Sequence, residues 1–329
     1  MQQTEIILRQ IVMLVLLGLI GFIAGKKKYL LENSGIVLSR LVINITAPIL
    51  IFTTLSRYDT SSKELFDGVY LYCFGIFFIV TSFFLAKTIG NRLQLLDKTK
   101  NVFQMHFMFG NVVFLAFPLL NSLFGEKGII YAIFFNLAND TILWTLGIYL
   151  VNHHNTKNFK ENIKHLLNAN SIAFILGLTV VLIKFNFKTE LMKITYLVDI
   201  TRFFDDTFYP LGKTTIYLSM VFIGLILSEI KIDSFSSLRE KYPIFILGFF
   251  KMLIIPIFAL VILKLFRNYV DDFIKNIIVI QLAMPCATIV SALSAQYKSD
   301  YKFATECVFV TTLVSIVTLP FIVYIISIF

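Results

Sequence analysis

Long apolar runs with almost no charge dominate this sequence, and short charged clusters such as Lys26–Lys28 and Arg239–Lys241 separate them. A bilayer core of ~30 Å takes roughly 20 apolar residues per helix. Hydrophobic residues fill 57% of the 329 positions and the mean hydropathy is +0.82, which is too apolar for a water-soluble domain. The chain is therefore expected to be an all-α polytopic membrane protein, a multi-pass protein of the cell membrane.

The apolar runs predict ten transmembrane helices, which we number as spans one to ten in chain order. They fall at about 6–25, 36–56, 68–90, 102–124, 128–151, 170–187, 207–230, 243–267, 273–297 and 303–328. Residues 1–151 then form a first five-helix repeat, 152–169 a connecting loop, and 170–329 a second five-helix repeat. An odd number of spans per repeat inverts one repeat relative to the other in the membrane. Residues 188–206, which are too polar to span, are predicted to form a helix along the membrane surface.

Lys and Arg indicate the orientation, because cytoplasmic loops carry an excess of them. Alternate loops hold fourteen and eleven of these residues. The richer set contains Lys98 and Lys298, and the poorer set contains Lys63 and Lys127. This bias predicts that both termini lie outside.

Several functional classes fit the sequence poorly. The net charge of +9 comes from residues at loop ends, without the basic stripe of a nucleic-acid site. The three cysteines, Cys73, Cys286 and Cys307, fall inside apolar runs, so neither a disulfide framework nor zinc spacing is indicated. No paired carboxylates, Ser-Lys pair or His cluster suggests an enzyme. We expect no nucleic-acid partner, no metal and no cofactor.

Helix breakers interrupt spans four and nine at corresponding positions of the two repeats. Span four contains Gly110, Asn111 and Pro118, and span nine contains Pro285 within 283–291. Proline removes an amide donor and disrupts the preceding turn. Non-helical backbone at membrane depth persists only where protein or a water-filled cavity satisfies it, and paired breaks mark binding sites in transporters. Helix N-termini at such breaks suit a carboxylate. Two proline kinks without a ligand are the alternative. Further breaks are expected in the second span at Asn44–Pro48 and in the seventh span around Gly212.

Five segments together resemble the auxin efflux carrier family, which includes plant PIN proteins and bacterial malate or malonate permease-like carriers. The segments are Leu41–Phe52, Asn111–Leu120, Asn136–Gly147, Met284–Tyr297 and Thr311–Pro320, and they occur in the family's order along nearly the whole chain. The resemblance implies two inverted repeats in which broken spans four and nine cross. It also implies a scaffold of spans 1, 2, 6 and 7 that dimerises, and a transport domain of spans 3–5 and 8–10 that moves as an elevator.

The same resemblance implies a secondary transporter of small organic anions, carboxylates that are auxin-like or dicarboxylates, bound where the broken spans cross. Asn111 corresponds to the asparagine expected to face the substrate carboxylate. The substrate-binding residues expected from the breaks and their surroundings are Gly110, Asn111, Pro118, Pro285, Thr288, Ser291, Asn44 and Asn139. Val113 and Ala116 replace the family's usual glycines, and Tyr217 stands where the family usually has proline.

Ionisable residues inside spans are costly and therefore indicate function. Asp140 lies within span five, and the sequence offers it as a proton or cation relay or as a structural carboxylate. Lys213 is either a membrane-depth cation that pairs with Asp140 and replaces a metal ion, or a residue that reaches the outer interface. His106 is the third coupling candidate, as a vestibule residue or as a histidine satisfied by a neighbour. Lys251 and Glu306 are assigned to packing.

Two other functions remain open on this evidence. A sodium-coupled symporter of the bile-acid type shares the broken-helix crossover and holds sodium with carbonyls and acidic side chains. The breaks here are poor in acids apart from Asp140, which disfavours sodium. A non-transporting membrane receptor is the other alternative. Expected partners are a small organic anion, the lipid bilayer and a second copy of the chain.

Overall fold

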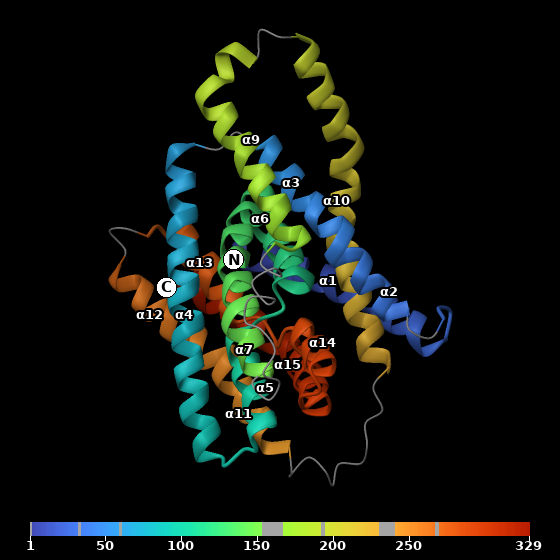
Figure 1. Ribbon diagram of the computed structural model, residues 1–329, viewed down its shortest axis with the longest axis vertical. Coiled ribbons are helices and arrows are strands. Elements are labelled where there is room, and N and C mark those ends of the chain that lie inside the picture. The colour runs from blue at the N-terminus through green and yellow to red at the C-terminus, as the bar shows by residue number, and fades with distance from the viewer. Residues whose placement is uncertain are drawn as a thin grey trace.

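The computed structural model describes residues 2–31, 34–58, 61–152, 167–191, 195–229, 241–266 and 270–329, and these ranges are helical almost throughout (Figure 1). The α-helices are α1 (Gln2–Lys26), α2 (Ser34–Leu41), α3 (Ala47–Arg57), α4 (Ser62–Arg92), α5 (Asp97–Met108), α6 (Phe117–Ile142), α7 (Ile148–Asn152), α9 (Ala169–Leu191), α10 (Thr195–Glu229), α11 (Tyr242–Phe249), α12 (Ile255–Leu265), α13 (Asp272–Leu282), α14 (Thr288–Gln296) and α15 (Tyr301–Ile328). Short π-helical segments join some of them, and these are η1 (Val42–Thr46), η2 (Val112–Ala116), η3 (Leu143–Gly147) and η6 (Phe250–Ile254).

Seven helices within the described ranges are long and apolar enough to cross a membrane. They are Ser34–Arg57, Lys63–Arg92, Val112–Asn152, Ala169–Asn186, Phe203–Ser228, Tyr242–Leu265 and Tyr301–Ile328. The remaining predicted spans fall on α1, whose apolar part is Val12–Lys26, and on the interrupted spans four and nine. The protein is a helical multi-pass membrane protein. The count of ten spans and the inverted repeat stay predictions.

The second and seventh spans differ from their predicted local structure. Residues 44–48, expected as a break, lie at the end of the π-helical segment η1 and the start of α3, so the helix widens there but continues. The expected break around Gly212 is absent, because α10 runs through Pro210 and Gly212 without interruption. Gly212 serves packing instead, since a Cβ at this position would lie 2.8 Å from the Leu50 amide nitrogen.

The predicted surface helix at 188–206 is also wrong. Residues up to Leu191 continue α9, and α10 begins at Thr195, so the segment extends two long helices (Figure 1). Residues 192–194 lie outside the described part of the chain. The apolar periodicity of this stretch was correct for a helix but carried no information about its direction relative to the membrane.

The helices form two groups. α1, α2, α3, α9 and α10 pack on one another, and α4–α7 pack with α11–α15. Figure 1 shows α3, α9 and α10 in the upper and right part of the view and α4, α5, α11 and α12 in the left and lower part. Within the first group, α1 and α10 approach so closely that a Cβ on Gly21 or Gly224 would overlap backbone of the facing helix. Small residues allow this kind of backbone-to-backbone packing in membranes.

Polar contacts gather on two faces of the molecule. On one face, which we call the Lys63 face, Lys63 pairs with Asp271 at 3.3 Å and Lys127 pairs with Glu64 at 3.5 Å. On the other, the Lys98 face, the Lys98 ammonium donates to the Lys298 carbonyl at 3.1 Å. Residues predicted to share a side of the membrane therefore meet. Which face is cytoplasmic stays a prediction.

Candidate functional site at the two helix breaks

The fourth span is interrupted between α5 and η2. α5 ends at Met108, and Phe109 has extended backbone with φ −105° and ψ 122°. Asn111 follows with φ −79° and ψ 70°, and the π-helical segment η2 begins at Val112. Pro118 lies buried in the first turn of α6, where it cannot donate a backbone hydrogen bond to the preceding turn. The unwound part is therefore Phe109–Asn111.

The ninth span is interrupted in the same manner. α13 ends at Leu282, and α14 begins at Thr288 after an extended Ala287 with φ −72° and ψ 129°. Pro285 lies in the interruption and is buried. Each break therefore leaves one half-helix that ends and another that begins at membrane depth.

The two breaks lie side by side. Gly110 and Cys286 form an isolated antiparallel bridge. The Asn111 amide donates to the Pro285 carbonyl at 2.9 Å, and the Ala287 amide donates to the Phe109 carbonyl at 3.2 Å. Unwound backbone at membrane depth must find such partners, and here each break supplies them to the other.

Gly110 makes this close pairing possible. A Cβ on Gly110 would lie 2.9 Å from the Met284 Cβ, closer than real side chains approach. A side chain at this position would therefore push the two breaks apart. Packing of the two breaks therefore explains the glycine at position 110, one of the predicted site residues, without a ligand.

Neighbouring helices hold the paired breaks in place. The Thr311 hydroxyl of α15 accepts a hydrogen bond from the Cys286 amide at 3.0 Å and donates to the Cys307 carbonyl at 2.7 Å. The Gln281 side-chain amide of α13 donates to the Ala132 carbonyl of α6 at 3.2 Å. These contacts tie the break of the ninth span to α15, and the helix before it, α13, to α6.

Helix N-termini follow each break and can bind an anion. The first amides of a helix lack partners within it, and the helix dipole places partial positive charge there. α14 has nine residues, and its first residue, Thr288, is partly buried. Ser291, one turn further, has a buried hydroxyl without a hydrogen-bond partner among the described residues. Asn111 is 3% exposed, and its side-chain amide makes no hydrogen bond within the described part of the chain.

Two further substrate-binding candidates, Asn44 and Asn139, lie outside the two paired breaks in sequence. Asn44 is exposed on η1 of the second span. Asn139 is buried on α6, next to Asp140. Neither takes part in the backbone hydrogen bonds between the breaks. Their roles in substrate binding stay predictions.

The coupling candidates occupy three separate environments. Asp140 is partly buried and accepts a hydrogen bond from the Asn136 side-chain amide at 3.4 Å. The Lys213 ammonium lies 3.7 Å from the Glu126 carboxylate and 4.6 Å from the centre of the Tyr209 ring. Lys213 and Asp140 are therefore not paired in this structure. His106 is fully buried, with Nε2 3.1 Å from the Ala304 carbonyl oxygen.

Sequence reasoning passed over Lys251, which it assigned to packing together with Glu306. Glu306 does form an ordinary ion pair with Lys241 at 3.1 Å. Lys251 is 2% exposed, and its ammonium donates to the Phe107 carbonyl at 3.1 Å, two residues before the first break. The signal was a lysine in the middle of a span whose other charged residues, Lys264 and Arg267, lie at its end.

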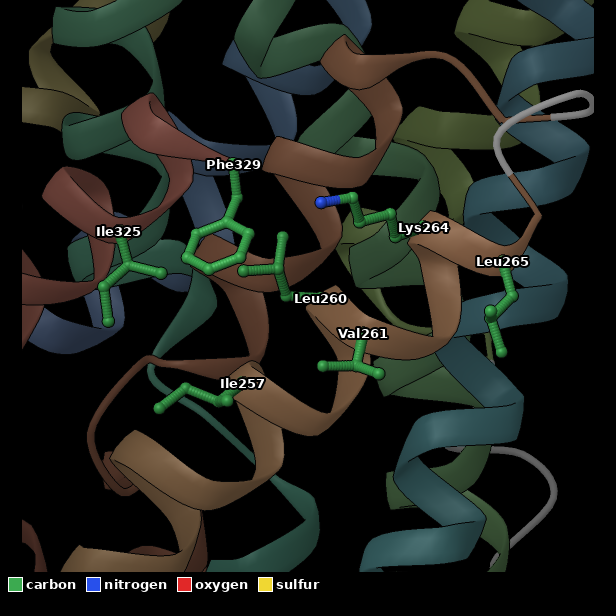
Figure 2. Close-up of a pocket in the computed structure, with 7 residues that line it drawn as sticks. All are labelled: Ile257, Leu260, Val261, Lys264, Leu265, Ile325 and Phe329. Carbon is green, nitrogen blue, oxygen red and sulfur yellow. The ribbon is translucent and has the colours of Figure 1, made fainter.

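Two of the cavities in the described part of the chain do not include the unwound residues of the breaks. One, of about 260 Å³, lies between α12 and α15, and the Lys264 ammonium lies over the Phe329 ring there (Figure 2). The other, of about 470 Å³, is an apolar groove between α1, α10, α6 and α15. None of the predicted site residues lines either cavity. Within the described ranges, no three His, Cys, Asp or Glu residues gather as metal ligands would.

Comparison with known proteins gives a consistent result along the chain. Residues 6–323 match the model of a family described as membrane transport protein. An uncharacterized transporter of Methanocaldococcus jannaschii is 26% identical over 318 residues, which cover 94% of this chain and 95% of the relative. An uncharacterized transporter of Methanothermobacter thermautotrophicus is 25% identical over 325 residues, which cover 97% of each chain.

Proposed function

Because this chain belongs to the membrane transport protein family, the auxin efflux carrier-like family, and is a transport protein and not an enzyme, we propose that it is a secondary transporter of small organic anions. The observation that carries the proposal is the backbone pairing of the two breaks through Asn111 and Pro285. Discontinuous helices that meet at membrane depth are where secondary transporters bind their substrates.

The chemistry of the paired breaks favours an anionic substrate. Two helices begin directly after them, at Val112 and Thr288, and their N-termini offer amide donors and positive dipole ends. Asn111 adds a side-chain amide that can donate to a carboxylate oxygen. Lys251 adds a positive charge close to the first break. Organic carboxylates, auxin-like or dicarboxylate, are the substrate class that we propose.

We propose elevator-type alternating access, in which the second helix group slides against the first. The close backbone contact of α1 with α10 supports the first group as a rigid scaffold. Beside the breaks the groups meet through Phe114 of η2 and Phe222 of α10, whose ring centres are 4.4 Å apart. Apolar ring contacts of this kind can be exchanged during sliding without leaving buried polar groups unpaired. A homodimer formed through the scaffold helices belongs to the same proposal.

Uptake by purified protein in liposomes tests the proposal. Radiolabelled malate, malonate and indole-3-acetate are the probes, and lysine is the cationic comparison. We expect uptake of at least one anion above empty liposomes and none of lysine. Thermal unfolding in the presence of the same compounds gives a second reading, because a ligand that binds the folded state raises its stability with concentration. Stabilisation by an organic anion without uptake would favour the receptor alternative, and the absence of both would contradict the proposed substrate class.

A further inference from the structure

A buried lysine stands at the end of the first half-helix of the site. Lys251 lies in the π-helical segment η6 of the eighth span and is 2% exposed. Its ammonium donates to the Phe107 carbonyl, 3.1 Å away, in the last turn of α5. The last four carbonyls of a helix have no partner within it, and Phe107 contributes one of them.

This position is electrostatically specific. The C-terminal end of a helix carries a partial charge of roughly −0.5. At membrane depth this charge lacks the bulk water that would screen it elsewhere. Within the described part of the chain, the Phe107 carbonyl is the hydrogen-bond partner of the Lys251 ammonium, and no carboxylate forms an ion pair with it. The ammonium is therefore placed by the helix end and not by an acidic side chain.

The same end of a half-helix has another use in coupled transporters. Half-helix C-termini and unwound carbonyls coordinate the coupling sodium ion in secondary transporters with broken helices. Here α5 ends beside the break, and the Phe109 carbonyl, two residues after Phe107, already accepts from the Ala287 amide. A tethered ammonium and a bound sodium ion would compete for the same carbonyl end.

We propose that Lys251 is the built-in cation of this site: its ammonium takes the place of a coupling sodium ion at the carbonyl end of α5. This inference rests on the proposed transport function and deepens it, because it assigns the sodium-independent class of coupling. It also moves to Lys251 a role that the sequence favoured for Lys213, which is 41% exposed and lies against Glu126.

Substitutions of different size test whether the charge or the packing of Lys251 matters. Lys251→Ala leaves room for an inorganic cation, whereas Lys251→Met fills the same space with an uncharged chain. Lys275→Met is the matched control, because Lys275 is also buried, at 5% exposure, but pairs with Asp272 at 2.6 Å in the first turn of α13. Each protein is assayed in sodium chloride and in N-methylglucamine chloride at equal ionic strength.

We expect the wild type and Lys275→Met to take up the anion found above equally well in both salts. In N-methylglucamine, Lys251→Ala and Lys251→Met should lose at least about ten-fold in uptake, as expected for a lost hydrogen bond from a charged group. Sodium should restore Lys251→Ala several-fold, raise its unfolding temperature, and leave Lys251→Met unchanged. If Lys251 had a purely structural role, Lys251→Ala and Lys251→Met would not differ in their response to sodium.

Three results would overturn the inference: wild-type uptake that requires sodium, wild-type activity in Lys251→Met, or an equal response of both variants to sodium. If Lys251→Ala does not fold, two other measurements test the inference. One is uptake by the wild type in the two salts. The other is uptake by Lys251→Arg, which keeps the charge and should exceed that of Lys251→Met. Absence of wild-type uptake would instead contradict the proposed function. The effect of sodium on unfolding of Lys251→Ala would still report on Lys251 in that case.

Discussion

The ammonium of Lys213 and the carboxylate of Glu126 lie 3.7 Å apart and join α10 of the first helix group to α6 of the second. The Tyr209 hydroxyl, one turn before Lys213, also donates to Glu126. Both charged side chains are about two-fifths exposed, at 41% and 40%. In the elevator movement that we propose, the two groups move past each other, and this contact would then belong to one access state.

Removing this ion pair should have a small effect on stability. Exposed pairs contribute roughly 0–1 kcal/mol, so Lys213→Met should lower the free energy of unfolding by less than about 1 kcal/mol. Chemical unfolding of the two proteins in detergent measures this change in the free energy of unfolding. If Lys213 instead pairs with Asp140 in the other access state, as the sequence suggested, the same variant loses more than ten-fold in uptake. Uptake within two-fold of the wild type would remove Lys213 from the coupling residues.

A methyl group on Gly110 should separate the two breaks. In Gly110→Ala the new Cβ would fall 2.9 Å from the Met284 Cβ, and overpacking of this kind costs about 1–3 kcal/mol. We expect a lower unfolding temperature and a loss of uptake. Gly248→Ala is the control, since its Cβ would meet the Thr311 Cγ2 at an ordinary 3.6 Å. Equal behaviour of the two variants would mean that the breaks tolerate displacement.

The interruptions of the fourth and ninth spans could be predicted because their cause is local. Pro285, and Gly110 beside Asn111, disfavour a helix whatever surrounds them. The same reasoning failed at Gly212, where the reason for the glycine is the backbone of Leu50 on another helix. A glycine required for helix packing and a glycine that breaks a helix look alike in a sequence.

The position of Lys251 shows the same limit for the site. Its partner is a main-chain carbonyl that lies 144 residues away in sequence. Every residue type has such a carbonyl, so no sequence motif predicts the contact. The contact of Lys213 with Glu126 was likewise not predicted, because Glu126 lies near the kink at Gly125 and not deep in a span. Burial and breaks follow from local sequence, whereas ion partners depend on how distant helices meet.

Asn111 should contribute directly to substrate affinity. Removal of its side-chain amide in Asn111→Ala should weaken binding of the transported anion at least about ten-fold, the value of a hydrogen bond to a charged group. The backbone hydrogen bond from Asn111 to Pro285 remains in this variant, so the fold should persist. Binding is measured by the concentration dependence of the thermal shift. The comparison is Asn186→Ala, because the Asn186 amide donates to the Leu182 carbonyl of its own helix on an exposed face. Equal affinity in the two variants would contradict the assignment.

Asp140 is the residue through which we expect proton coupling. It lies within the apolar stretch Val112–Asn152, and the Asn136 amide holds one of its oxygens at 3.4 Å. A carboxyl group at this depth can bind and release a proton, whereas an asparagine cannot. The isosteric Asp140→Asn should therefore fold normally but lose the part of uptake that an imposed pH gradient drives, while exchange of labelled for unlabelled anion continues.

Asp67→Asn separates this coupling role from the general effect of removing a buried carboxylate. Asp67 is 6% exposed and accepts from the Tyr131 hydroxyl at 2.9 Å, near the start of α4 on the Lys63 face. Its amide replacement can still accept that hydrogen bond, so the response to the pH gradient should match the wild type. An Asp140→Asn protein that retains pH-driven uptake would leave Asp140 as a structural partner of Asn136. Loss of exchange together with pH-driven uptake would place Asp140 in substrate binding, because exchange needs the site and its movement but no net proton transfer.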